Sequence, residues 1–307
     1  MANKDFITIR SFTAAEIRKL IDDAVEIKAN PGKYADSLKG KALAMIFEKP
    51  SLRTRVSFDV GIHQLGGFSI YLSPAEINLG KRESVADVAR NLERMVQGVM
   101  ARTFSHQVVE ELASHAHIPV INGLTDFNHP CQALADYMTI LEVKKGLAGK
   151  KLAYVGDGNN VAVSLIKGAA QLGVHLSLAT PPGYEPNAEV VQWARTRGAE
   201  TGCTIVLTHD PVEAAKNADA IYTDVWTSMG QEAEKDLRLK LFRPFQVNDE
   251  LFSHARPDAI FLHCLPAHRG EEVTDAVIES PRSVVFQQAE NRLHAQKAIM
   301  LSLMGKR

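Results

Sequence analysis

Two hydroxyl side chains and two arginines occur together in residues 51–55, directly after the apolar run Ala42–Phe47. A strand followed by a helix would place Ser51 at the helix start, where its side chain can cap the helix. Backbone N–H groups at a helix N-terminus attract anions, and guanidinium groups add strong donors for phosphate. The segment therefore predicts a phosphate site, although a capped surface helix with a solvated basic turn fits it equally.

Two further polar segments lie in the first half of the chain. Arg102 ends the apolar run Gly98–Arg102, and open parallel sheets bind ligands at the carboxyl ends of their strands. His129 and Gln132 stand at the start of a predicted helix, with Pro130 at its first position. Taken singly, His129 and Gln132 are better explained as structural polar residues than as ligand contacts.

A glycine-containing turn, Gly156–Val161, follows the apolar run Lys151–Val155 in the second half. Val161 stands where a dinucleotide-binding fingerprint needs its third glycine, and no acidic residue ends the next predicted strand. We therefore expect a tight turn that presents Asn159 or Asn160 to a ligand. A nicotinamide-dependent oxidoreductase is the weaker alternative.

The segment Asp224–Gly230 supplies an acid, a hydroxyl and an indole after another predicted strand, which suits a small ligand with an amine. A capping Asp with a packed Trp is the competing interpretation. His263 and Cys264 end the next strand, but neighbouring strand residues point to opposite faces, and no Asp, His and Cys set completes a coordination sphere. We therefore expect no metal. Arg292, near the chain end, could be a solvated helix arginine.

Short apolar runs that alternate with helix-like segments must position these residues. Such alternation predicts an α/β fold with two domains, each a mostly parallel sheet flanked by helices. The strands are expected at residues 42–47, 68–72, 98–102, 119–122, 151–155, 175–179, 204–207, 220–224 and 259–263. The domains are expected to join near Gly146–Lys150, and the tail from Ala289 to Lys306 should form a last helix.

Two predicted helices have apolar residues at helical spacing. One face of the helix after residue 51 carries Val56, Val60 and Leu65, and that helix should stop at Gly66 and Gly67. The stretch from Ser84 to Val96 is expected to bury a second face. That face comprises Val85, Val88, Leu92, Met95 and Val96.

The composition excludes several classes of protein. The 307 residues carry 35 basic and 36 acidic side chains, a net charge of −1 that argues against a nucleic-acid or anionic-membrane coat. No apolar run reaches the length of a membrane span, and the first residues lack a secretion signal. Three scattered cysteines indicate neither disulfides nor a CxxC metal site and fit a cytoplasmic protein.

Five of these segments, in this order, resemble the transcarbamoylase (aspartate/ornithine carbamoyltransferase) family. They are Ser-Leu-Arg-Thr-Arg at 51–55, Arg-Thr at 102–103, His-Pro-Cys-Gln at 129–132, Asp224 with Ser-Met-Gly at 228–230, and His-Cys-Leu-Pro at 263–266. The last two resemble the ornithine branch rather than the aspartate branch. Leu52 departs from the family pattern, which usually has Thr there, but its backbone N–H remains and phosphate binding should survive.

The resemblance implies an enzyme that transfers the carbamoyl group of carbamoyl phosphate to the side-chain amine of L-ornithine, giving L-citrulline and phosphate in arginine metabolism. It implies a carbamoyl-phosphate domain at residues 1–146, to which the C-terminal helix at 289–307 returns, and an ornithine domain at 147–288. It also implies a homotrimer or a higher multiple, with a loop from the neighbouring subunit entering the site. No metal, cofactor, nucleic acid or membrane is required.

The resemblance also implies a role for individual residues. Carbamoyl phosphate would be held by Ser51, Leu52, Arg53, Thr54, Asn78, Arg102, His129, Gln132, Cys264, Leu265 and Arg292. The ornithine contacts would be Asn160, Asp224, Ser228 and Met229. The catalytic set would be Arg102, His129, Cys264 and Arg292, with Cys264 orienting the reacting amine rather than acting as a covalent nucleophile.

Two alternatives within the same fold remain. A non-catalytic binding protein could keep this fold, although the retained arginines, His129 and Cys264 argue against it. Carbamoyl transfer to aspartate, putrescine or an acylated ornithine is also conceivable. Asp224 disfavours an acidic substrate and favours a free amino group. The sequence does not distinguish arginine synthesis from arginine breakdown, nor a trimer from a larger assembly.

Overall fold

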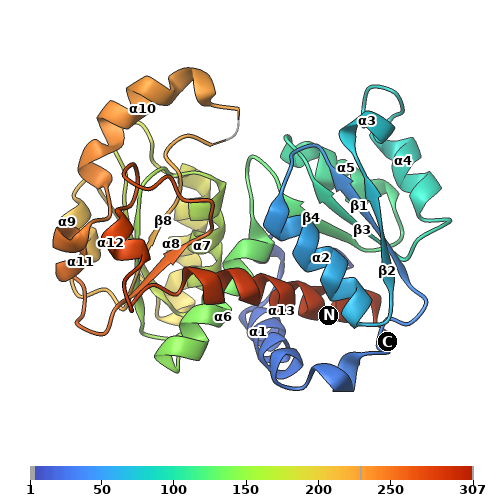
Figure 1. The fold of residues 1–307 in the computed structure, drawn as a ribbon, viewed down its shortest axis with the longest axis horizontal. Coiled ribbons are helices and arrows are strands. Elements are labelled where there is room, and N and C mark those ends of the chain that lie inside the picture. The colour runs from blue at the N-terminus through green and yellow to red at the C-terminus, as the bar shows by residue number, and fades with distance from the viewer. Residues whose placement is uncertain (1–3, 229, 306–307) are drawn as a thin grey trace. The chain divides into compact units, whose positions relative to one another are not determined.

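The computed structural model describes residues 4–228 and 230–305, which form two parallel sheets with flanking helices (Figure 1). The chain divides into two compact units. Unit 1 runs to Met138 and resumes at Glu290, and unit 2 is Thr139–Ala289. The predicted fold class is confirmed, including the parallel direction of the strands.

The sheet of unit 1 has the strand order β2-β1-β3-β4. Its strands are β1 (Ala42–Phe47), β2 (Phe68–Leu72), β3 (Gly98–Arg102) and β4 (Val120–Leu124). All six residues of β1 are buried, as expected of a parallel strand that is covered on both faces. The central position of β3 brings Arg102 to the carboxyl edge between β1 and β4.

The sheet of unit 2 has the order β7-β6-β5-β8-β9. Its strands are β5 (Lys151–Val155), β6 (His175–Ala179), β7 (Ile205–Thr208), β8 (Ala220–Thr223) and β9 (Ile260–His263). The order along the sheet changes direction at β5 and β8, and ligands of such sheets bind outside the strand ends at this point. The segments after β5 and β8 are those that carry Asn159 and Asp224.

The helices follow the strands in the predicted alternation. They are α1 (Ala14–Ala29), α2 (Leu52–Gln64), α3 (Pro74–Ile77), α4 (Val85–Leu92), α5 (His106–His115), α6 (Pro130–Lys144), α7 (Asn160–Leu172), α8 (Ala188–Thr201), α9 (Pro211–Ala215), α10 (Lys235–Phe242), α11 (Asp249–Ser253), α12 (Asp275–Ile278) and α13 (Val285–Met304). In the part of the chain that the structure describes, no helix is both long and apolar enough to cross a membrane.

Helix α13 returns to the first unit, as the resemblance implied. Lys28 of α1 donates a hydrogen bond to Asn291 (Nζ–Oδ1 2.8 Å), and Lys297 donates one to Gln64 of α2 (2.9 Å). Gly61 of α2 faces the same helix, since a Cβ there would lie 3.0 Å from Met300 Cε. This packing, visible in Figure 1 beside α1 and α2, places Arg292 in unit 1.

Two predicted apolar helix faces are only partly buried: Leu65, Val85, Val88 and Val96 are buried, but three other members are exposed. Val56 and Val60 are 50% and 39% exposed, and α2 instead buries the side of Phe58 and Ile62. Met95 is 67% exposed because α4 ends at Leu92, so the helical spacing does not continue to it. The apolar residues on the outer side of α2 are therefore left on the surface of unit 1.

Candidate functional site

The start of α2 is built as the sequence predicted. Ser51 is the N-cap, and its side chain accepts a hydrogen bond from the backbone N–H of Thr54 (3.2 Å). Leu52 is the first helical residue and is 73% exposed, so its side chain is not packed in the core and only its backbone belongs to the helix start. Arg53 follows in the first turn. Backbone N–H groups at a helix N-terminus of this kind can serve as donors for an anion.

Thr54 joins two arginines from distant parts of the chain. Its Oγ1 accepts hydrogen bonds from Arg292 Nη2 (3.1 Å) and from Arg102 Nη1 (3.5 Å). Arg102 is 6% exposed and Arg292 2% exposed. The arginines predicted separately at the end of β3 and in the last helix thus meet at the start of α2. Arg292 is therefore not a solvated helix arginine.

Gln132 extends this arrangement into α6. Its Oε1 accepts a hydrogen bond from Arg292 Nη1 (2.6 Å), and its Nε2 donates one to Asp136 Oδ1 (2.7 Å). Gln132 is 1% exposed and Asp136 is fully buried. The sequence analysis did not select Asp136. The available signal was an acid placed one helical turn after Gln132 in a largely apolar helix.

His129 precedes α6 and is 5% exposed. Burial holds the pKa of His129 well below its ordinary value, and the positive charges of Arg292, Arg102 and Arg53 lower it further. The imidazole is therefore neutral at pH 7 and can donate one hydrogen bond without adding a fourth positive charge. We call Thr54, Arg102, His129, Gln132 and Arg292 the unit 1 cluster.

Asn78 lies in a different setting within unit 1. It follows α3, has an exposed side chain and adopts a left-handed backbone conformation (φ 45°). Its carbonyl accepts hydrogen bonds from the backbone N–H groups of Lys81 and Arg82 (3.0 Å each). A role for Asn78 therefore depends on the neighbouring subunit that the resemblance implies.

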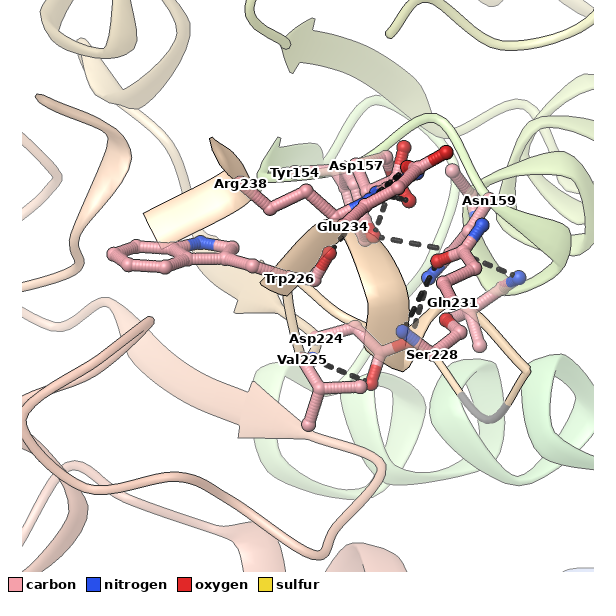
Figure 2. A network of polar contacts seen from close by, with 12 residues as sticks. Tyr154, Asp157, Asn159, Asp224, Val225, Trp226, Ser228, Gln231, Glu234 and Arg238 are labelled. Atoms are coloured by element: carbon pink, nitrogen blue, oxygen red, sulfur yellow. Dashed lines mark hydrogen bonds and ion pairs between the residues drawn. The ribbon is translucent and has the colours of Figure 1, made fainter. Parts of the chain in front are cut away.

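Asp224 is the centre of a second cluster, in unit 2. The thiol of Cys264 donates a hydrogen bond to Asp224 Oδ1 (2.9 Å), and Asn159 Nδ2 donates one to Oδ2 (2.8 Å). Asp224 is 6% exposed, and Figure 2 shows its carboxylate beside Asn159 and Ser228. We call Asn159, Asp224, Ser228 and Cys264 the unit 2 cluster. The end of β8 and the segment after β9 supply its acid and its thiol.

The other residues predicted to bind the amine ligand differ in their contacts with Asp224. Asn159 caps α7 and bonds Asp224, whereas Asn160 is the first residue of α7. The backbone N–H of Ser228 donates a hydrogen bond to Gln231 Oε1 (3.1 Å), and Gln231 N–H returns one to Ser228 O (3.0 Å). Met229 lies outside the described residues.

Arg238 of α10 supports the segments that carry this cluster (Figure 2), and the sequence analysis missed it. It is 5% exposed and donates hydrogen bonds to Asp157 Oδ2 (2.8 Å) and to the carbonyl of Trp226 (3.0 Å). Burial raises the pKa of Asp157 to about 6 in spite of the opposing charge of Arg238. In sequence, Arg238 and Glu234 are an ordinary i,i+4 surface pair, so no spacing distinguishes the buried arginine.

The glycine turn before Asn159 serves close backbone packing. A Cβ on Gly158 would lie 2.3 Å from the backbone nitrogen of Pro186, and Gly156 has φ 146°. Both positions therefore exclude other residues for steric reasons. The turn presents Asn159 to Asp224, which agrees with the predicted use of these glycines and not with a dinucleotide fingerprint.

Three residues that could ligate a metal ion lie close together after β8 and at the end of β9, and the expectation that no metal is bound stays a prediction. Potential ligand atoms of Asp224, His263 and Cys264 lie within 4.8 Å of one another, because Cys264 follows the end of β9 and strand alternation no longer applies. His263 Nδ1 accepts the Leu265 N–H (2.8 Å), and Nε2 donates to Glu272 (3.1 Å). Both ring nitrogens are thus engaged in holding the segment after β9, in which Leu265 has φ 58°.

The structure thus defines a class: an α/β enzyme of two units, with a cationic cluster in one and an acid–thiol cluster in the other. Two family models match the chain. Residues 4–142 match the model described as "Aspartate/ornithine carbamoyltransferase, carbamoyl-P binding domain", and residues 148–303 match "Aspartate/ornithine carbamoyltransferase, Asp/Orn binding domain". The chain belongs to the aspartate/ornithine carbamoyltransferase family, and the resemblance predicted from its motifs is confirmed.

Individual relatives agree with this placement. The chain is 58% identical to an ornithine carbamoyltransferase of Thermococcus kodakarensis, over 99% of this chain and 98% of the relative. It is 56% identical to a protein of Pyrococcus furiosus named "Ornithine carbamoyltransferase, anabolic", with the same coverage. A solved structure of ornithine carbamoyltransferase from Pyrococcus furiosus superposes with a TM-score of 0.95, covering 98% of this chain and 96% of that one.

Proposed function

We propose that this chain transfers the carbamoyl group of carbamoyl phosphate to the side-chain amine of L-ornithine, releasing L-citrulline and phosphate. It is an ornithine carbamoyltransferase. The observation that carries the assignment is the opposite charge of the two clusters. Buried arginines meet in unit 1, and a buried carboxylate lies beside a thiol in unit 2. A phosphorylated anion and an amine are the ligands that such clusters complement.

The unit 1 cluster would hold carbamoyl phosphate. The helix start at Ser51, Leu52, Arg53 and Thr54 offers backbone and side-chain donors to the phosphate. Arg102 would bind the phosphate oxygens that become the leaving group. Fixed donors of this kind stabilise the charge that develops during reaction, and loss of one costs about 10²–10³ in rate.

The carbamoyl end would meet His129, Gln132 and Arg292. A neutral His129 and the Arg292 guanidinium can both donate to the carbonyl oxygen, which becomes negative when the amine attacks. Gln132 directs its carbonyl oxygen toward Arg292, and this oxygen can also accept from the carbamoyl amide. Leu265 and Cys264 of unit 2 would complete the contacts of the carbamoyl group.

The unit 2 cluster would hold ornithine. Asp224 pairs with an ammonium group, Asn160 and Ser228 bind the amino-acid end, and Met229 belongs to the same segment. Cys264, already hydrogen-bonded to Asp224, would orient the reacting amine. Such an amine has a pKa of about 10.4 in water, so it must lose its proton before its nitrogen lone pair can attack.

The proposed step balances without a redox agent or a metal. The neutral amine nitrogen forms a bond to the carbamoyl carbon, the carbon–oxygen bond to phosphate breaks, and phosphate leaves with the bonding electron pair and takes up the proton that the amine nitrogen gives up. The oxidation state of carbon does not change. Holding both substrates in a fixed orientation supplies much of the remaining acceleration. We place the reaction in arginine biosynthesis, in line with the anabolic relative, and in the cytoplasm, in line with three free thiols.

A homotrimer is the second part of the proposal. Val56 and Val60 of α2 and Phe68 and Ile70 of β2 are 39–51% exposed. β2 is an edge strand, and Arg55 of α2 stacks on its Tyr71 (3.9 Å to the ring centroid). An exposed apolar face on a sheet edge favours a protein partner. We assign it to a second copy of this chain, whose loop would deliver Asn78 to the neighbouring site.

The proposal is tested by measuring the carbamoylated (ureido) product formed from carbamoyl phosphate with ornithine, aspartate, putrescine and N-acetylornithine, which is L-citrulline for ornithine. Product should form with ornithine and be at least about 100-fold slower with the other three, since a site built for one polar group rejects analogues that lack it. N-acetylornithine lacks the free α-amino group, putrescine the carboxylate and aspartate the side-chain amine. Equal rates with N-acetylornithine would contradict the Asp224 assignment, and equal rates with putrescine the Ser228 assignment. Light scattering on the same sample should give three times the 33.7 kDa chain mass or a multiple of it.

A further inference from the structure

We propose that Asp136 is a positioning residue that locks the amide of Gln132 with its carbonyl oxygen toward the carbamoyl group. The enzyme would thereby select an acyl phosphate that carries an amino group. The inference rests on the proposed function, because it assumes that carbamoyl phosphate occupies the unit 1 cluster. It adds a residue that would not touch the substrate and a reason for its buried carboxyl group.

The geometry around Gln132 has one donor side and one acceptor side. Gln132 Nε2 lies 2.7 Å from Asp136 Oδ1, and Gln132 Oε1 lies 2.6 Å from Arg292 Nη1. Asp136 is fully buried, and Gln132 and Arg292 are 1% and 2% exposed. All three side chains are therefore shielded from water, which could otherwise satisfy either orientation of the amide.

The chemistry of the two neighbours fixes the amide. A carboxylate accepts hydrogen bonds and a guanidinium donates them. A flipped amide would place its oxygen against Asp136 and its NH₂ group against Arg292, so two buried hydrogen bonds would become two repulsive pairs. Asp136 and Arg292 together thus hold the amide in one orientation. A carboxylate at position 136 can only accept from Gln132, whereas an amide at this position could also donate to a flipped Gln132.

The fixed oxygen has a use in substrate selection. A carbonyl oxygen has two acceptor lone pairs, so Gln132 Oε1 can accept from a carbamoyl NH₂ in addition to Arg292. Acetyl phosphate has a methyl group in place of that NH₂ and would leave this acceptor without its second donor. Inorganic phosphate has neither group and reports on the phosphate contacts alone.

The accepting oxygen that Asp136 presents to Gln132 makes the expected pattern distinctive. Asp136→Asn keeps the size of the side chain but offers both an NH₂ and an oxygen to Gln132, so position 136 then accepts either amide orientation and Arg292 alone opposes the flip. It removes no positive charge from Arg102 or Arg292. Phosphate affinity should therefore hold or increase, whereas preference for the carbamoyl group should fall.

The experiment measures the dissociation constants of carbamoyl phosphate, acetyl phosphate and inorganic phosphate by calorimetry, in the wild-type enzyme and in Asp136→Asn. We expect the carbamoyl-to-acetyl preference to fall about tenfold, the scale of one lost hydrogen bond. Phosphate affinity should not fall by more than about twofold. Cys131→Ser, a buried polar change on the same helix, is the matched control and should keep the wild-type preference.

An exchange variant provides the second arm. Gln132→Glu combined with Asp136→Asn moves the carboxylate to position 132, where both of its oxygens accept and no flip exists. The carbamoyl-to-acetyl preference should return in this double variant. The proposal is overturned if Asp136→Asn keeps the wild-type preference, if it weakens all three ligands equally, if the exchange variant does not recover, or if neither variant folds by circular dichroism.

Failure of the proposed function looks different. In that case the wild-type enzyme forms no citrulline or shows no preference for carbamoyl over acetyl phosphate before any residue is changed. A wild-type enzyme that has both properties, with an unaffected Asp136→Asn variant, contradicts the role of Asp136 alone.

Discussion

The unit 1 and unit 2 clusters use positive charge in different ways. In unit 1 the cations Arg102 and Arg292 converge on Thr54 and are themselves the proposed binding groups. In unit 2 the cation Arg238 is not part of the cluster. It donates hydrogen bonds to Asp157 and to the Trp226 carbonyl, in the segments that carry the cluster. A cation can therefore be a ligand contact or a brace within one chain, and burial alone does not distinguish them.

The comparison also shows what each cluster requires of its neighbours. In unit 1, burial and then the positive charges of the arginines hold the pKa of His129 well below its ordinary value and keep the imidazole neutral, so charge is concentrated on the arginines. In unit 2, burial raises the pKa of Asp157 to about 6, and Arg238 offsets part of the cost of burying that carboxylate. If this comparison is correct, changes in unit 1 should affect turnover, and changes in unit 2 should affect ornithine binding or stability.

The largest effect is expected from Arg102→Ala. Removing a fixed donor to the departing phosphate should lower kcat by about 10²–10³ or more, while circular dichroism shows a folded protein. Arg90→Ala, a change of an exposed arginine in the same unit, is the control and should retain wild-type kcat. A near-normal kcat in Arg102→Ala would remove this residue from the proposed role.

Asp224→Asn should weaken the binding of ornithine and leave the binding of carbamoyl phosphate nearly unchanged. We expect the KM for ornithine to rise about tenfold or more, because a charge-assisted contact to the amine is lost, with little change in the KM for carbamoyl phosphate. Asp258→Asn, an exposed acid of unit 2, controls for loss of one negative charge. An unchanged ornithine KM in Asp224→Asn would refute the assignment.

Arg238→Met tests whether this cation is a brace. The variant leaves Asp157 buried without its partner and should lower the free energy of unfolding by about 3–5 kcal/mol, measured by urea denaturation at pH 7. Adding Asp157→Asn should restore part of the loss. Arg238→Lys should keep more stability than Arg238→Met. An unchanged free energy of unfolding in Arg238→Met would show that the Arg238–Asp157 ion pair does not stabilise the fold.

A smaller effect concerns His129 and pH. Because its pKa in the folded protein is lowered, the unfolded chain takes up a proton near pH 6.5 that the folded chain does not. His129 therefore reduces stability as pH falls below about 6.5, by at most about 1.4 kcal/mol per pH unit. His129→Gln should flatten the dependence of unfolding free energy on pH between about 5 and 7.5.

The control for that experiment is His63→Gln, which changes an exposed histidine of the same unit. The lowered pKa would be contradicted if His129→Gln and the wild-type protein lost stability in parallel as the pH falls.

The smallest effect is expected from Leu52→Thr. Leu52 is exposed at the start of α2, and its proposed contact to phosphate is through the backbone. Restoring the usual family hydroxyl should therefore change kcat/KM for carbamoyl phosphate by about threefold or less. Arg53→Ala, in the next position, is the positive comparison. A gain of about 100-fold in Leu52→Thr would show that the missing hydroxyl matters.

Local sequence signals predicted much of the scaffold. The buried runs Ala42–Phe47, Gly98–Arg102 and Lys151–Val155 become strands with the expected bounds, because a continuous apolar run bounded by turn residues has few other stable states. Ser51 caps its helix as predicted, since capping depends on residues within one turn. Helix faces were less predictable: Val56 and Val60 are exposed, and residue type alone does not say which apolar face stays on the surface.

The sequence by itself thus determined the elements, the family and the residues at the strand ends, because each depends on local pattern or on ordered motifs. The tertiary structure decided how distant side chains combine. Thr54 contacts Arg292, 238 positions away, and Arg238 contacts Asp157, 81 positions away. No local spacing encodes such pairs, because they form when sheet topology and the return of α13 bring separate segments together.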